Sequence, residues 1–216
     1  MDYELLFKAT FETLYMTFFG TLFGYLLGFP LGIFLTTSSK NGIAPLPKAN
    51  AVVSWIVNIG RSIPFIILIA VLIPTTRAVM GSATGTTPMI FPLLVGSAPF
   101  VARMVETSLQ EVNQGVIEAA QVMGASHFQI ITRVMIPEAL PSIIRGISIS
   151  TITILTYTAM AGSMGGGGLG SVAINRGYLG FNFPMLMGAL VLIIIIVQVL
   201  QSLFSVLSKK MDKRIR

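Results

Sequence analysis

The side chains that could catalyse a reaction or bind a metal are few in this sequence of 216 residues. Cysteine is absent, and the single histidine, His127, has no other ligand-type side chain at metal-binding spacing. No pair of carboxylates lies within a hydrophobic stretch, where it could relay protons across a membrane. We therefore expect neither catalysis nor a metal site in this chain, and a proton-coupled transporter is disfavoured.

The glycine-rich stretch GSMGGGGLG (162–170) partly matches a phosphate-binding loop. Gly165 and Gly170 have the spacing of such a loop, but Ser171 stands where the loop requires lysine. Nucleotide binding is therefore not expected here. Two interpretations remain: a flexible or tightly packed backbone that offers a lip to an extracytoplasmic partner, and a simple loop.

The composition indicates a membrane protein. Hydrophobic residues make up 54% of the chain and charged residues only 10%, with a mean hydropathy of +0.84, whereas soluble domains carry about 25% charged residues. The net charge of +6 does not indicate nucleic-acid binding, because five of the fourteen basic residues lie in KKMDKRIR (209–216), a sequence typical of a membrane-surface anchor. A secretory signal peptide is not expected, because acidic residues precede the first hydrophobic stretch.

Five stretches come close to the requirement for spanning a bilayer, which is about 20 mostly apolar residues. We expect an all-α integral membrane protein with transmembrane helices at about 14–36, 51–76, 86–108, 139–162 and 183–207. The second helix contains one charge, Arg61, and the third is the weakest because it holds three prolines.

The distribution of basic residues predicts the orientation of these helices. Ten Lys and Arg residues fall in 36–50, 103–145 and the C-terminal tail, whereas three fall in the alternate segments. Because Lys and Arg collect on the cytoplasmic side, we expect the N-terminus outside and the C-terminus inside. Residues 1–12 would form an extracytoplasmic tail, residues 13–207 the transmembrane domain, and residues 208–216 a basic cytoplasmic tail.

The cytoplasmic segment 111–137 is too polar to span a membrane and too regular to be a linker. Helical periodicity in VIEAAQVM (116–123) puts apolar and small residues on one face, with Glu118 and Gln121 on another. This pattern predicts a short amphipathic helix.

A second short helix is predicted to follow. Gly124 stands where a left-handed C-terminal cap is expected, and Ser126 with Gln129 matches a capping box. We expect this second helix to end near Pro137, because Pro137 and Pro141 frame a turn that returns the chain to the membrane.

Two interpretations of this hairpin are open. It could lie on lipid headgroups, or it could dock a protein. An interfacial helix favours Lys and Arg on its polar face, whereas residues 111–132 contain none and carry the carboxylates of Glu111 and Glu118. The acidic, small-residue surface therefore favours a protein partner.

The sequence Glu118-Ala119-Ala120, followed by Gly124 and by Ile136-Pro137, resembles the EAA motif of the membrane subunits of bacterial ABC importers. In that family the motif forms a coupling helix that inserts into a cleft of the ATP-binding subunit. The resemblance covers about residues 13–207. It includes NIGRSIPFIIL (58–68), GSAPFVARMVE (96–106) and YTAMAGSMGGGGLG (157–170), which are similar to the permease of methionine importers. It implies the type I ABC importer permease fold and these coupling residues: Glu118, Ala119, Ala120, Met123, Gly124, Ala125 and Pro137.

The resemblance also implies the assembly and its setting. A homodimer in the bacterial cytoplasmic (inner) membrane would bind two copies of a cytoplasmic ATPase, which hold ATP and magnesium, and an extracytoplasmic substrate-binding lipoprotein. This chain would itself hold no cofactor and hydrolyse nothing, and its expected cargo is an amino acid, methionine. The alternatives are a channel or secondary transporter without an ATPase, an importer for another small polar solute, and a structural factor that docks an enzyme.

Three residues are candidates for the transport pathway. SISTITILTYTAM (148–160) is rich in hydroxyl groups, and in the family this helix lines the pathway, so Tyr157 and Met160 are candidate lining and gating residues. Ordinary core packing is the alternative for both. Arg61 either lies near the pathway or a subunit interface, or caps backbone carbonyls freed by Pro64.

Overall fold

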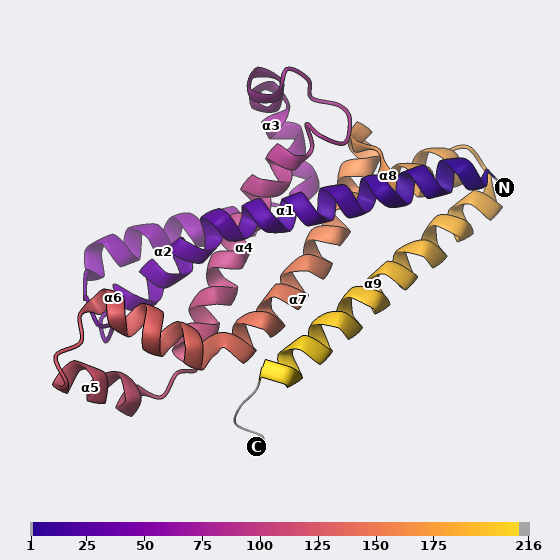
Figure 1. Ribbon diagram of the computed structural model, residues 1–216. Coiled ribbons are helices and arrows are strands. Elements are labelled where there is room, and N and C mark those ends of the chain that lie inside the picture. Colours follow the sequence, from indigo (N-terminus) through magenta and orange to yellow (C-terminus); the bar gives the residue numbers. More distant parts are fainter. Residues whose placement is uncertain (1, 212–216) are drawn as a thin grey trace.

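The computed structural model describes residues 2–211, which form a bundle of helices with no strand among them (Figure 1). The α-helices are α1 (Tyr3–Thr37), α2 (Pro47–Ser62), α3 (Phe65–Met80), α4 (Ile90–Gln110), α5 (Gln114–Val122), α6 (His127–Ile130), α7 (Ile136–Ala161), α8 (Gly168–Ser171) and α9 (Phe183–Met211). Three π-helical segments accompany them, at Ile131–Met135, Gly162–Gly166 and Val172–Tyr178. The predicted all-α class is confirmed for this part of the chain.

Four helical stretches are long and apolar enough to cross a membrane, namely α1, α4, the continuous stretch His127–Gly166, and α9. The pair α2 and α3 supplies a fifth when both are taken as one span, although they are bent by 104° at their junction. The five spans correspond in order to the five predicted helices, so the expected membrane architecture is confirmed.

Helix α1 begins at Tyr3 and not near residue 14, so the first helix is longer at its N-terminal end than predicted. Asp2 caps the helix, because its Oδ1 accepts a hydrogen bond from the Leu5 amide at 3.0 Å. Leu6 and Ala9 are buried in a cluster that includes residues of α9. Apolar residues of this segment recur at helical spacing and pack inward.

The predicted helix at 51–76 is in fact two helices with a sharp bend between them. Helix α2 starts earlier, at Pro47, and ends at Ser62, after which Ile63 is extended with ψ of 122°. Proline disfavours the helical conformation in the residue before it, so Pro64 explains this break. Helix α3 then runs in a new direction (Figure 1).

The predicted turn at Pro137 and Pro141 is absent, because the chain runs as one helical stretch from His127 to Gly166. Pro137 lies in the first turn of α7, directly after the π-helical segment Ile131–Met135. Wider π-helical turns accommodate irregular hydrogen bonding, and proline is tolerated at the start of a helix. The expectation of a turn was wrong: these local effects accommodate Pro137, and Pro141 lies inside the unbroken helix α7.

A stripe of glycines brings α1 into close contact with α4. Gly24, Gly28 and Gly32 are buried at four-residue intervals on one face of α1. A Cβ added to Gly28 would lie 2.7 Å from the carbonyl oxygen of Ala98, and one added to Gly32 would lie 2.6 Å from Val105. Small residues at this spacing let membrane helices approach closely, so α1 lies directly against the core.

The two ends of the bundle carry different elements (Figure 1). The start of α1, the start of α9 and α8 lie together at one end. Helices α5 and α6 lie at the opposite end, toward which α9 runs. This arrangement separates the short amphipathic helices from the glycine-rich segment.

Candidate coupling surface and transport pathway

Three local features, two of them predicted above, fix the corner formed by α5 and α6: an asparagine cap, a left-handed glycine and a capping box. Asn113 Oδ1 accepts a hydrogen bond from the Gly115 amide at 2.8 Å and so begins α5. Gly124 adopts φ of 79°, as expected for a left-handed cap. The Ser126 amide donates to Gln129 Oε1 at 2.8 Å, and the Gln129 amide donates to Ser126 Oγ at 3.3 Å. The predicted glycine cap and capping box are therefore confirmed.

The inner face of this corner packs against the ends of α4 and α7. Ile117, Ala120 and Ile130 are buried in a cluster with residues of both long helices, and Ala125 packs against it. Of the predicted coupling residues, Ala120 and Ala125 thus face inward, and they position the corner.

The outer face of the corner is exposed and unusually apolar. Val122 is 89% exposed, Met123 80% and Phe128 74%, and Glu118 and Ala119 beside them are exposed as well. Exposed apolar groups gathered at one site mark an interaction surface. We call Glu118, Ala119, Val122, Met123 and Phe128 the docking surface. Sequence reasoning missed Val122 and Phe128, although an inner face at 117 and 120 already directs position 122 outward.

Pro137, the last of the predicted coupling residues, is exposed but lies on α7, beyond the π-helical segment. Glu111, at the end of α4, forms a 3.7 Å ion pair with Arg145 of α7. This pair links the two long helices beside the corner but lies outside the docking surface.

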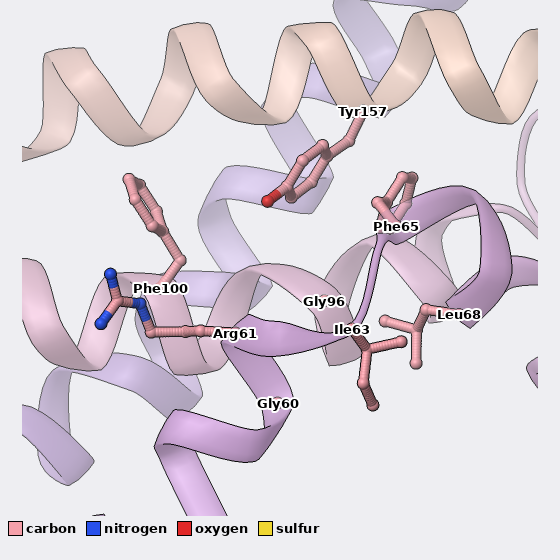
Figure 2. Close-up of a pocket in the computed structure, with 8 residues that line it drawn as sticks. All are labelled: Gly60, Arg61, Ile63, Phe65, Leu68, Gly96, Phe100 and Tyr157. Atoms are coloured by element: carbon pink, nitrogen blue, oxygen red, sulfur yellow. The ribbon is translucent and has the colours of Figure 1, made fainter.

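A small cavity of about 110 Å³ lies at the bend between α2 and α3. Arg61 of α2, Phe100 of α4 and Tyr157 of α7 all line this cavity (Figure 2). The Tyr157 ring stacks on Phe65, with centroids 4.2 Å apart and an angle of 12° between planes. Two of the three predicted pathway residues therefore meet at one cavity.

Met160, the third predicted pathway residue, lies one turn further along α7 and does not line this cavity. Its side chain is 38% exposed. It lies on the same exposed stripe of α7 as Ile149 and Thr156.

Sequence reasoning treated Arg103 only as a marker of orientation, but the structure gives it a role in joining α4 to α2. Its Nη1 donates to Glu106 Oε2 at 2.6 Å, and its Nη2 donates to Asn58 Oδ1 at 2.9 Å and to the Ser54 carbonyl at 3.2 Å. The signal available in the sequence was the spacing of Arg103 and Glu106, which places both on one helical face.

The backbone of the glycine-rich segment packs closely against α1 and α7. Glu12 Oε2 accepts a hydrogen bond from the Gly168 amide at 2.7 Å, and Thr13 Oγ1 accepts one from the Leu169 amide at 2.8 Å. A Cβ on Gly170 would collide with the backbone of Ala159. The segment therefore closes one end of the bundle against α1.

No group of three or more His, Cys, Asp and Glu side chains in residues 2–211 is arranged to hold a metal ion. The polar contacts described above join helices to one another.

Comparison with known proteins gives the family. Residues 28–216 match the family described as binding-protein-dependent transport system inner membrane components. The chain belongs to this family, and it is therefore an inner-membrane subunit of a transport system.

Individual relatives resemble nearly the whole chain. A probable D-methionine transport system permease protein of Vibrio cholerae is 43% identical over 214 residues, covering 99% of this chain and 95% of the relative. A methionine import system permease protein of Bacillus subtilis is 43% identical over 182 residues, covering 84% of each.

Solved structures agree with this assignment. An inward-facing structure of the MetNI methionine ABC transporter contains a chain that matches with a TM-score of 0.95, 42% identity and 97% coverage of both chains. A chain from an amino acid ABC transporter matches with a TM-score of 0.78 and 22% identity, which shows the fold alone. The resemblance inferred from the EAA motif is confirmed, and this chain has the type I ABC importer permease fold.

Proposed function

We propose that this chain is the permease subunit of an ATP-driven importer and that its cargo is methionine. The observation that carries this proposal is the match to the methionine transporter, which extends over 97% of both chains at 42% identity. The curated relatives are methionine permeases as well, and they match at 43% identity. ATP and magnesium belong to a partner subunit, because this chain has no phosphate-binding loop.

The assembly is a homodimer with two ATPase subunits and an extracytoplasmic binding lipoprotein. Four or five spans form one half of a symmetric conduit, and a two-fold homodimer supplies the other half. Each copy then presents one docking surface, so two ATPase subunits are needed. The family description itself specifies dependence on a binding protein.

The docking surface enters a cleft of the ATPase. Val122, Met123 and Phe128 supply apolar area, and Glu118 supplies a carboxylate that makes no ion pair within residues 2–211. Gly124 and Pro137 contribute by shaping the backbone. We assign the docking contacts to the exposed side chains because Ala120 is buried and Ala125 packs against the inner cluster.

Movement passes from the docking surface to the pathway along one element. The helical stretch His127–Gly166 begins at the docking surface and continues as α7 (Figure 1). Tyr157 and Met160 belong to α7. Closure of the ATPase subunits displaces α5 and α6, and the continuous helix transmits that displacement to the pathway. Hydrolysis then restores the inward-facing state.

The orientation follows from the same arrangement. Helices α5 and α6 lie at the end of the bundle toward which α9 runs, and Lys209 and Lys210 lie in its last turn. We place this end in the cytoplasm because basic residues collect there, and we place the glycine-rich segment at the outer face.

The experiment that tests this function is reconstitution of the permease in liposomes with its ATPase and binding protein. The proposal predicts uptake of methionine that requires both ATP and the binding protein. Uptake without nucleotide would indicate a channel or a secondary transporter instead. Uptake of another solute in preference to methionine would correct the cargo and leave the class intact.

A further inference from the structure

Arg61 of α2 and Arg103 of α4 differ in what their side chains contact. Arg103 is held by Glu106 and by polar groups of α2, whereas Arg61 makes no hydrogen bond or ion pair within residues 2–211. A charged side chain within a membrane protein normally pairs with another group or faces a cavity. Arg61 lines the cavity at the bend between α2 and α3 (Figure 2).

No carboxylate within residues 2–211 forms an ion pair with Arg61. Glu106, near the C-terminal end of α4, is bound to Arg103. Glu12 accepts the Gly168 amide at the outer end, and Glu111 pairs with Arg145 at the cytoplasmic end. The remaining acidic residues in the described part of the chain lie near the ends of the bundle, at Asp2, Glu4, Glu118 and Glu138.

The chemistry of the cavity suits an anion attached to an apolar molecule. Arg61 provides a forked cationic donor and Tyr157 a hydroxyl group, while Phe100, Leu68 and Ile63 form apolar walls. Tyr157 is held in place by its stack on Phe65. The guanidinium fork matches the geometry of a carboxylate.

The cavity has room for a polar group. Its volume of about 110 Å³ is well above the roughly 10–15 Å³ that one water molecule requires. A carboxylate can therefore enter it beside Arg61.

We propose that this cavity binds the α-carboxylate of the transported amino acid during its passage, with Arg61 as the counter-ion and the Tyr157 hydroxyl as a second donor. The inference rests on the proposed function and adds a substrate subsite within the membrane. Tyr157 belongs to the continuous helix that begins at the docking surface, whereas Arg61 belongs to α2. Movement of that helix therefore separates the two donors, and the site releases its ligand when the conduit changes state.

The test measures equilibrium binding of radiolabelled L-methionine to the complex of permease and ATPase, in nanodiscs without binding protein. L-Methioninamide, which lacks the carboxylate, serves as the comparison ligand. We expect saturable binding of methionine and binding of the amide weaker by at least about tenfold. Arg61→Gln should weaken methionine binding by about 10- to 100-fold, because a hydrogen-bonded charge pair is lost, and should leave amide binding unchanged.

Two further variants complete the design. Arg61→Lys keeps the charge without the fork and should give intermediate affinity. Arg77→Gln removes an exposed arginine of α3 that lies outside the cavity, and it should bind methionine like the wild type. If Arg61→Gln does not assemble with the ATPase, Arg61→Lys and the wild-type comparison of acid with amide decide the matter.

Three results would overturn the proposal: methionine binding by Arg61→Gln within twofold of the wild type, equal binding of acid and amide, or no saturable binding by a wild-type complex that transports methionine. In each case ATP-dependent uptake can persist, so the result would contradict the proposed subsite and leave the proposed function intact. Loss of ATP-dependent uptake in the wild type would instead contradict the function. If uptake identifies another amino acid, that acid and its amide replace the methionine pair.

Discussion

Two prolines at helix junctions have opposite consequences in this molecule. At Pro64 the chain bends by 104° between α2 and α3, whereas at Pro137 the helix continues into α7 without a break. The bend creates the cavity beside Arg61, and the continuous helix joins the docking surface to Tyr157. The same residue type thus makes a fixed corner in one place and allows a continuous helix in the other.

The difference lies in what precedes each proline. Ile63 adopts an extended conformation, so α2 has already ended when Pro64 begins the next helix. Before Pro137, the residues Ile131–Met135 are π-helical, and Ile136 keeps helical angles of −65° and −48°. The residue before the proline thus keeps a helical conformation at Pro137 and an extended one at Pro64.

The largest effect is expected from breaking the continuous helix within α7. Ser148→Pro removes a backbone donor from the helix interior and should destabilise the permease by about 3 kcal/mol or more. ATP-dependent uptake should be lost as well. Thermal unfolding of the purified complex measures the first effect, and uptake in liposomes measures the second. Ser148→Ala is the matched control, and wild-type stability in Ser148→Pro would contradict the structure of α7.

Charge reversal at the docking surface should act on association and not on folding. Glu118→Lys is expected to weaken binding of the ATPase by about tenfold or more, because it replaces the only carboxylate of that surface. The melting temperature of the isolated permease should change little, since Glu118 is exposed. Glu4→Lys makes the same change at the opposite end of the bundle and should leave ATPase affinity unaltered. Equal affinities for the two variants would contradict the assignment of the docking surface.

A smaller loss is expected when apolar area is removed from the same surface. Met123→Ala should cost about 1–2 kcal/mol of ATPase binding, as estimated from the buried area lost, which corresponds to roughly tenfold in affinity. Val79→Ala, at an exposed position near the end of α3, is the control. Titration of the ATPase into permease nanodiscs gives both values, and an unchanged affinity for Met123→Ala would exclude it from the contact.

The smallest effects on stability are expected when each of the two prolines is replaced by alanine. Pro64→Ala relieves the restriction on Ile63 and should destabilise the permease by up to about 1 kcal/mol, because the bend loses its pre-set backbone. It should also weaken methionine binding in the cavity. Pro137→Ala should change stability by about 0.5 kcal/mol or less, since the helix is continuous already. Thermal unfolding of both variants is the measurement, and a larger effect at Pro137 would reverse the comparison.

Features set by a few neighbouring residues could be predicted from the sequence. The left-handed cap at Gly124 and the capping box of Ser126 with Gln129 are local, and both are present. The five spans follow from hydropathy because lipid imposes helical structure on any spanning segment. The packing of Glu12 against the glycine-rich segment joins residues 156 positions apart, and no local pattern indicates it.

Features that depend on the direction of helices could not be predicted. Arg61 and Tyr157 were both selected as candidates, but their meeting at one cavity depends on the bend at Pro64. Proline rules alone predicted a turn at Pro137, because they do not anticipate the π-helical turn before it. The role of Arg103 depends on α2 lying beside α4, where Asn58 and Ser54 reach its guanidinium.

The central claim is that ATPase closure drives methionine transport through the docking surface and the continuous helix. The most direct measurement is methionine uptake and ATP hydrolysis in the same liposomes, which contain binding protein and either the wild type, Glu118→Lys or Glu4→Lys. The account predicts uptake only with ATP, at least about tenfold less uptake for Glu118→Lys at saturating ATPase, and wild-type uptake for Glu4→Lys. Uptake by Glu118→Lys equal to the wild type, or uptake without ATP, would contradict it.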